Sequence, residues 1–183
     1  FGKKTQIVAV SKNHPRKSVE KALKHGVRIF GENRVQEAKT KFENLKKEYP
    51  DLELHLTGPL QTNKAKEAIK LFDVFHTLDR EKLAKELAKQ GGLKNKKFFI
   101  QVNTGKEDNK SGIYLEHLYE FANFCRNDLN LNIVGLMCIP PINDKPSEHF
   151  SILEKEAKNN NLFQLSMGMS SDYTEAIKHN ATD

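Results

Sequence analysis

The feature that most constrains this chain is a strict alternation of short apolar runs with longer segments of helical periodicity. The apolar runs, which we expect to be strands, are Gln6–Ser11, Arg28–Gly31, Glu53–Thr57, Val74–Thr77, Phe98–Asn103, Asn132–Cys138 and Phe163–Met167. The expected helices are Arg16–His25, Arg34–Tyr49, Asn63–Phe72, Arg80–Gln90, Leu115–Asp128, Ser147–Asn159 and Ser171–His179. Strand–helix units in this order predict a mainly parallel sheet with its helices outside.

Two architectures fit this alternation, an open doubly wound sheet and a closed barrel. The Gly-x-Gly-x-x-Gly signature that usually supports a dinucleotide-binding sheet is absent from the sequence. Polar residues follow nearly every strand, and strand ends converge on one mouth in a (β/α)8 barrel. A barrel needs an eighth strand, which would begin about where the sequence stops, after Thr182 and Asp183. We therefore predict one domain over residues 1–183, a (β/α)8 TIM barrel truncated at its eighth strand.

Composition excludes several classes of protein. The formal net charge is +6, but 25 of the 30 basic residues are lysines, scattered along helices and often near a glutamate. Such faces are typical of solvated surfaces, so we expect no nucleic-acid partner. No run of 18 apolar residues and no signal peptide is visible, so we expect no membrane association. Two cysteines, Cys125 and Cys138, lack metal-ligand spacing and indicate a cytoplasmic protein with reduced thiols.

The last strand leads into the most informative motif of the chain. After Leu165 the sequence reads Ser166-Met167-Gly168-Met169-Ser170-Ser171, and a helix is expected to begin at Ser171 or Asp172. Serine hydroxyls and free backbone N–H groups at a helix N-terminus form a phosphate site, and barrels often bind phosphate after strands seven and eight. The alternative is an ordinary strand-to-helix turn in which Ser171 is the N-cap.

Lys12 follows directly on the first apolar strand. A lysine partly buried at a barrel mouth loses its proton more easily, and a neutral amine can form a Schiff base with an aldehyde such as pyridoxal phosphate. The alternative is a surface lysine that merely ends the strand. After the second strand, Glu32 could pair with a lysine, and Asn33 could bond a ring substituent of a cofactor or cap the next helix.

The histidines give no metal signal. His55 lies in the third expected strand, where a core histidine with satisfied hydrogen bonds is commoner than a catalytic one. The other histidines are expected on helix faces or in loops, without metal-ligand spacing, so we predict no metal site. Asp79 is expected to cap the fourth helix.

Seven motifs together resemble the pyridoxal-phosphate homeostasis protein family (the YggS/PROSC group). They are Val8-Ala9-Val10-Ser11-Lys12, Phe30-Gly31-Glu32-Asn33, the run from His55 to Lys64, Gln101-Val102-Asn103, Lys110-Ser111-Gly112, the run from Gly135 to Pro140 and the run from Ser166 to Asp172. They occur in family order over nearly the whole chain. The resemblance implies a barrel like the N-terminal domain of alanine racemase.

The resemblance also assigns the site. It implies pyridoxal 5'-phosphate held as a Schiff base on Lys12, with Asn33 beside the ring. The phosphate would be held by residues near the C-terminus, namely Ser166, Met167, Gly168, Ser170 and Thr182. Against the family pattern, this sequence lacks the usual N-terminal helix and the eighth strand, so we expect an incomplete cofactor site.

The function implied is non-catalytic. We expect a monomeric protein that buffers pyridoxal phosphate and delivers it to pyridoxal-phosphate-dependent apo-enzymes. The alternative is a small amino acid racemase that uses the same cofactor. Racemases of this fold need a second base on the opposite face of the cofactor, supplied by a separate domain that this sequence does not contain.

Overall fold

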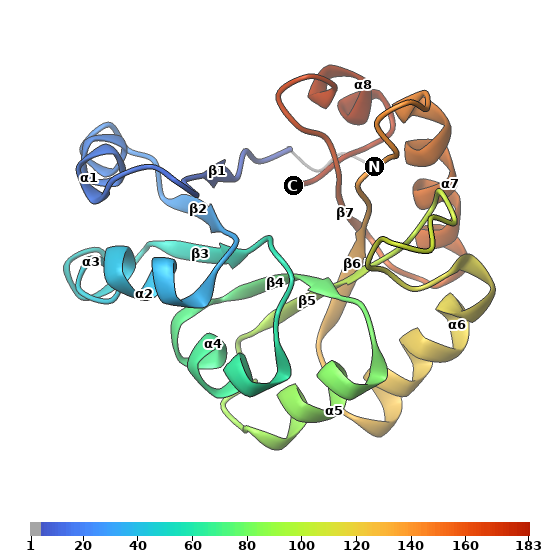
Figure 1. Ribbon diagram of the computed structural model, residues 1–183, viewed down its shortest axis with the longest axis horizontal. Helices are drawn as coiled ribbons and strands as arrows, with labels where there is room; N and C mark the ends of the chain where they lie inside the picture. The colour runs from blue at the N-terminus through green and yellow to red at the C-terminus, as the bar shows by residue number, and fades with distance from the viewer. Residues whose placement is uncertain (1–4) are drawn as a thin grey trace.

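The computed structural model describes residues 5–183, which form seven parallel strands with helices packed outside them (Figure 1). The strands neighbour one another in chain order, β1 to β7. Their bounds are β1 Ala9–Val10, β2 Ile29–Glu32, β3 Glu53–Leu56, β4 Val74–Leu78, β5 Lys97–Gln101, β6 Ile133–Met137 and β7 Gln164–Ser166. All seven predicted strands are present, although β1 has only two residues where Gln6–Ser11 is predicted, because Ile7 and Val10 at this edge of the sheet are exposed rather than buried.

The helices follow the predicted order, but one predicted helix is divided into two, and two others contain a turn that is not α-helical. They are α1 Arg16–Lys24, α2 Val35–Phe42, α3 Leu45–Glu48, α4 Ala65–Leu71, α5 Glu81–Lys89, α6 Leu115–Asn123, α7 Pro146–Asn159 and α8 Tyr173–Lys178. A 3-10 turn, η1 (Thr62–Lys64), precedes α4, and a π-helical turn, η2 (Phe124–Asp128), continues α6.

The helix predicted over 34–49 is wrong as a single element. It is divided into α2 and α3, and the amine of Lys46 on α3 donates to the carbonyl oxygen of Leu71, 2.9 Å away at the end of α4. This tertiary contact holds α3 beside the next unit. The predicted cap of the fourth helix is also wrong, since Arg80 is the N-cap of α5 and the carboxylate of Asp79 pairs with the Arg80 guanidinium instead.

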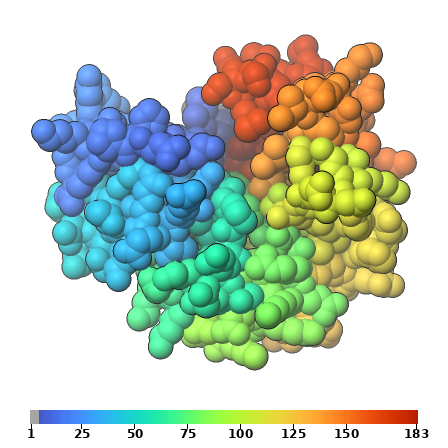
Figure 2. All heavy atoms as spheres, in the orientation of Figure 1, coloured from blue at the N-terminus to red at the C-terminus, as the bar shows by residue number. Residues whose placement is uncertain are grey.

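The sheet curls into an open half-barrel. Its first and last strands are joined by residues near the C-terminus, where Gln6 N donates to Thr182 O at 2.9 Å and Thr182 N donates to Leu165 O at 2.9 Å. The space-filling view shows a hollow between the N-terminal elements in blue and α8 in red (Figure 2). The last three residues thus lie between the two edges, at the place where a barrel has its eighth strand.

The apolar core lies between the sheet and the surrounding helices. Its largest fully buried side chains include Phe30, Phe42, Phe72, Phe98 and Phe150. Gly135 allows β6 and β7 to approach, because a Cβ there would lie 2.1 Å from the carbonyl oxygen of Gln164. In residues 5–183 no helix is long and apolar enough to cross a membrane.

Candidate functional site

The loop after β1 is held by a buried charge cluster. Ser11 Oγ donates to Glu32 Oε1 at 2.6 Å, and the amine of Lys41 on α2 lies 2.9 Å from the same oxygen. Lys41 also donates to the carbonyl oxygen of Ser11 at 2.7 Å and to Glu37 at 2.7 Å. Ser11, Glu32 and Lys41 are all buried. The prediction that Glu32 pairs with a lysine is confirmed, and Lys41 is the partner.

Lys12 itself lies in the turn that this cluster supports. Its side chain is exposed, so the expected partial burial is wrong for this structure. In residues 5–183 the Lys12 amine makes no hydrogen bond or ion pair. The next residue, Asn13, has a φ of 63° and donates its N–H to Glu37 at 2.7 Å. The backbone that carries Lys12 is therefore fixed from β2 and α2, while its amine is available.

Asn33 follows β2 and is tied to the next unit of the sheet. Its Oδ1 accepts a hydrogen bond from Thr57 Oγ1 at 2.9 Å. Gly58 packs on its backbone, because a Cβ at position 58 would lie 2.4 Å from the carbonyl oxygen of Asn33. Arg34, not Asn33, is the N-cap of α2. Asn33 thus keeps its side-chain amide nitrogen free of partners among the described residues, and its place beside a cofactor ring stays a prediction.

The turn after β7 presents a row of unpaired donors. Within the described chain, the backbone N–H groups of Gly168, Ser170 and Ser171 have no hydrogen-bond partner, whereas the Met169 N–H between them donates to Asp172 Oδ1 at 2.6 Å. Gly168 has a φ of +98°, and a Cβ there would lie 2.8 Å from the Cβ of Ala176 on α8. Because α8 has only six residues and Asp172 is its N-cap, the donors belong to the turn rather than to a helix end.

Two other predicted phosphate residues lie on the strand side of this turn. Met167 is buried and its N–H donates to the carbonyl oxygen of Asp183 at 3.2 Å. Thr182 is buried, and its Oγ1 accepts a hydrogen bond from Leu165 N at 2.9 Å and donates to Asp183 at 2.7 Å. The Thr182 hydroxyl thus contacts the β7 backbone, and a phosphate contact by it stays a prediction.

A chain of hydrogen bonds crosses the barrel interior and ends at Ser166. Glu53 Oε1 lies 2.8 Å from His55 Nε2, and His55 Nδ1 lies 2.8 Å from His76 Nε2. His76 Nδ1 lies 2.7 Å from Ser166 Oγ. The prediction that the other histidines lie on helix faces or in loops is wrong for His76, which is buried in β4. The signal that could have found it is the fourth apolar run, which contains His76 at its centre.

The environments of Glu53 and His76 shift the pKa of each side chain. The hydrogen bond from His55 lowers the pKa of Glu53 to about 2, so the carboxylate is ionised at neutral pH. Burial holds the pKa of His76 well below its ordinary value, which leaves this imidazole neutral. The ring of Phe99 stacks on His76 with centroids 4.6 Å apart. A neutral imidazole carries one N–H and one acceptor nitrogen, so His76 donates to one of its two partners, His55 or Ser166, and accepts from the other.

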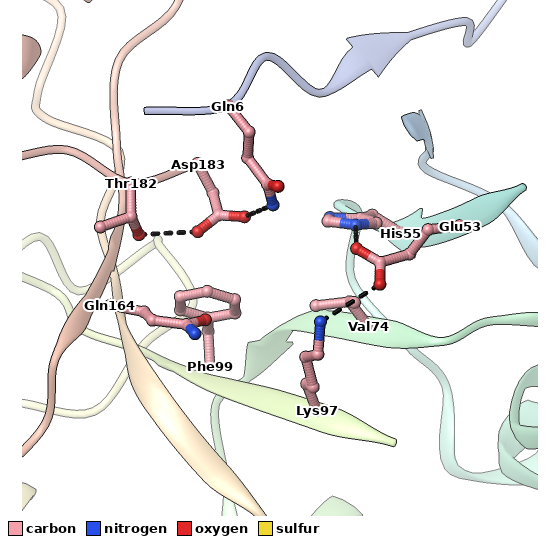
Figure 3. Close-up of a pocket in the computed structure, with 9 residues that line it drawn as sticks. All are labelled: Gln6, Glu53, His55, Val74, Lys97, Phe99, Gln164, Thr182 and Asp183. Atoms are coloured by element: carbon pink, nitrogen blue, oxygen red, sulfur yellow. Dashed lines mark hydrogen bonds and ion pairs between the residues drawn. The ribbon is translucent and has the colours of Figure 1, made fainter. Parts of the chain in front are cut away.

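A cavity of about 140 Å³ opens where the strands begin (Figure 3). It is lined by the first residues of four strands, Glu53, Val74, Lys97 and Gln164, and by Gln6, His55, Phe99, Thr182 and Asp183. In Figure 3 the carboxylate of Glu53 lies between His55 and Lys97, across the cavity from Asp183. This cavity is at the amino ends of the strands, whereas Lys12, Asn33 and the 166–171 turn follow the carboxyl ends.

Comparison with known proteins identifies the family. The family model of the alanine racemase N-terminal domain matches residues 1–182. The pyridoxal phosphate homeostasis protein of Vibrio alginolyticus is 38% identical over an alignment of 189 positions, which covers 97% of this chain and 81% of that protein. The chain belongs to the pyridoxal phosphate homeostasis protein family. The predicted family is thereby confirmed.

Solved structures agree with this family membership. PipY of Synechococcus elongatus, solved without PLP, superposes with a TM-score of 0.89 at 37% identity and covers 97% of this chain and 88% of its own. The form described as having PLP bound gives a TM-score of 0.87 at 35% identity, with the same coverage of both chains. Alanine racemase from Corynebacterium glutamicum is 14% identical, with a TM-score of 0.71, and covers 97% of this chain and 52% of its own. At that identity it supports the barrel fold alone.

Proposed function

We propose that this protein binds pyridoxal 5'-phosphate through Lys12 and the turn after β7 and serves cofactor homeostasis rather than catalysis. The observation that carries the proposal is the row of unpaired N–H groups at Gly168, Ser170 and Ser171, because an anion is the ligand that such a row can satisfy. PipY, a member of the same family, has been solved with PLP bound.

The residues present fit this cofactor. Gly168 itself carries no side chain, and the neighbouring Ser166 and Ser170 hydroxyls can add hydrogen bonds to those of the backbone donors. Lys12 supplies an amine without competing partners, and Asn33 offers its amide nitrogen at the end of the adjacent strand. When bound, pyridoxal phosphate supplies an aldehyde that condenses with a lysine amine. We also propose Thr182 and the backbone of Met167 for the phosphate site, which requires that they exchange their present hydrogen bonds to Asp183 for bonds to the phosphate.

A carrier role is supported by what the family members are called, namely pyridoxal phosphate homeostasis proteins. We propose that the protein is monomeric and cytoplasmic, that one domain spans residues 1–183, and that it hands the cofactor to apo-enzymes. Nucleic acid and membranes are not proposed as partners.

The decisive experiment is borohydride reduction of protein incubated with pyridoxal phosphate, followed by peptide mass spectrometry. We expect the reduced cofactor on Lys12, and we expect Lys12→Ala to remove the labelled peptide and the visible absorption of the bound cofactor. Lys17→Ala, an exposed lysine on α1, is the matched control and should label normally.

Two outcomes would contradict the proposal. Labelling spread over several surface lysines and unchanged in Lys12→Ala would show that Lys12 is not the site. Interconversion of L- and D-alanine well above the rate with free cofactor would favour the racemase alternative over a carrier.

A further inference from the structure

Glu53, His55, His76 and Ser166 form a series of hydrogen bonds through the barrel interior, where apolar side chains could fill the same space. This series places two histidines, one with no exposed side-chain surface and the other buried, between a cavity at one end of the barrel and the predicted phosphate turn at the other. Buried polar side chains carry a desolvation cost that an apolar core would avoid. This cost indicates that the hydrogen bonds serve the groups at their two ends, the Glu53 carboxylate and the Ser166 hydroxyl.

Proton accounting restricts the chain to two arrangements. The ionised Glu53 carboxylate can only accept, so His55 Nε2 carries a proton in both. If His55 is neutral, its Nδ1 accepts from His76 Nε2–H. His76 Nδ1 must then accept, so the Ser166 hydroxyl donates inward to His76 and offers only lone pairs to a ligand.

The second arrangement contains one more proton. The extra proton enters at Ser166 Oγ, Ser166 passes its own proton to His76 Nδ1, and His76 passes its Nε2 proton to His55 Nδ1. His55 is then the cation, His76 remains neutral in its other tautomer, and the Ser166 hydroxyl is free to donate outward. The Glu53 carboxylate, 2.8 Å from His55 Nε2, compensates the positive charge.

We propose that Glu53, His55 and His76 are positioning residues that set the direction of the Ser166 hydroxyl, so that anion binding at the turn after β7 is linked to the uptake of one proton by His55. This inference rests on the proposed phosphate site. It adds that the Ser166 hydroxyl donates to the anion only in the second arrangement, in which His55, His76 and Ser166 together hold four protons instead of three.

The surroundings of His55 support this linkage. The charged or titratable groups that face it are Glu53 on its own strand, His76 on β4, Lys97 on β5 and Asp183 across the cavity. Lys97 lies 3.2 Å from the second Glu53 oxygen, which keeps the carboxylate oriented. Glu53 is 29% exposed on the cavity, so solvent reaches the charged end of the chain although His55 is fully enclosed.

The first test uses sulfate, which keeps its double negative charge throughout the range of interest. We expect sulfate affinity, measured by calorimetry, to fall about tenfold as the pH rises, because binding takes up a proton that becomes scarcer. Calorimetry in two buffers of different ionisation enthalpy should give an uptake of up to one proton per sulfate bound. Ser166→Ala should remove this uptake.

The second test reads the tautomers directly. Nitrogen-15 spectra of histidine-labelled protein should show His76 with its proton on Nε2 when free and on Nδ1 when sulfate or pyridoxal phosphate is bound, with His55 becoming doubly protonated. This measurement needs no variant, so it holds even if a substitution in the core prevents folding.

The third test depends on the sign of an effect. Simple charge repulsion predicts that removing a carboxylate strengthens anion binding, and Glu175→Gln on α8, directly after the turn, should show this. The proposal predicts the opposite for Glu53→Gln, a weakening of about tenfold at neutral pH, because His55 loses the partner of its charged form.

The outcomes separate this inference from the proposed function. If Lys12 is labelled by pyridoxal phosphate but the tautomer of His76 does not change, or Glu53→Gln strengthens sulfate binding as Glu175→Gln does, the inference alone is overturned. If neither sulfate nor pyridoxal phosphate binds, the proposed function fails and the inference fails with it.

Discussion

At the scale of single residues, the turn after β7 depends on the backbone of one glycine. Gly168 adopts a φ of +98°, a region that side chains rarely enter, and its missing Cβ leaves room for Ala176. In the described part of the chain, the N–H groups of Gly168, Ser170 and Ser171 in this turn have no protein acceptor. An anion at this turn, as proposed above, would find these N–H groups already without protein partners.

Gly168→Ala should lower both stability and anion affinity. We expect a loss of about 1–3 kcal/mol in the free energy of unfolding from backbone strain, with a further cost from the contact with Ala176. Gly91→Ala is the matched control, since Gly91 has a φ of +70° and open space around it. Urea unfolding and sulfate titration check this, and equal losses in the two variants would contradict the role of the Ala176 contact.

Glu53 makes stability depend on pH in a defined window. The hydrogen bond from His55 lowers its pKa from an ordinary 4.5 to about 2, so its ionised form is stabilised by folding. That contribution, up to about 3 kcal/mol, is complete above pH 4.5 and is lost as the pH falls to about 2. We expect Glu53→Gln to unfold less steeply with acid in this window by chemical denaturation. An unchanged acid profile would be evidence against the ionised state.

At the scale of elements, α2 does more than cover the sheet. Its Lys41 joins β2 through Glu32 and the loop after β1 through the carbonyl oxygen of Ser11, so three elements share one buried amine. Glu32 Oε2 has no hydrogen-bond partner in the described part of the chain, so its carboxylate relies on Lys41 and Ser11. The position of the Lys12 turn follows from this cluster.

Lys41→Met should therefore destabilise the protein strongly. Removing the amine leaves the buried Glu32 carboxylate without its counter-charge, which costs about 3–5 kcal/mol in comparable cases. We also expect slower labelling of Lys12 by pyridoxal phosphate, because the turn that carries it loses an anchor. Lys39→Met, at an exposed position of the same helix, is the control. Thermal unfolding would refute the expectation if both variants melted alike.

At the scale of the whole molecule, the half-barrel is joined where the two ends of the chain meet. The side chain of Thr182 accepts from Leu165 N, and its backbone bonds both Leu165 and Gln6. These contacts link β7 to the segment before β1 across about 176 residues, as the hydrogen bond from Thr5 Oγ1 to Ala181 O also shows. The relative position of Lys12 and the 166–171 turn depends on this junction.

Thr182→Val keeps the shape of the side chain but removes the acceptor for Leu165 N. A buried N–H left without a partner costs about 1–3 kcal/mol, so we expect that loss of stability together with faster amide exchange at Leu165. Thr174→Val, on the exposed face of α8, should have little effect. Hydrogen exchange measured by NMR checks both, and an unchanged rate at Leu165 would contradict the assigned contact.

The sequence alone determined the order of elements and the ends at which chemistry can occur. Periodicity is a local property, so seven strands, their helices and the polar turns after Ser11, Glu32 and Leu165 could be predicted from neighbouring residues. The position of Lys12 after the first strand made it a candidate for a Schiff base, and the family resemblance then selected it over the alternative of a surface lysine.

Only the tertiary structure decided which residues are partners. Lys41 for Glu32, His76 for both His55 and Ser166, and Leu165 for Thr182 are contacts between residues 9 to 90 positions apart. The exposure of Lys12 and the split of the 34–49 helix also depend on what packs nearby. Hydrogen bonds and burial depend on neighbours within a few ångströms in space. Those neighbours come together only when the sheet curls and brings its first and last strands close, so a local sequence pattern does not reveal them.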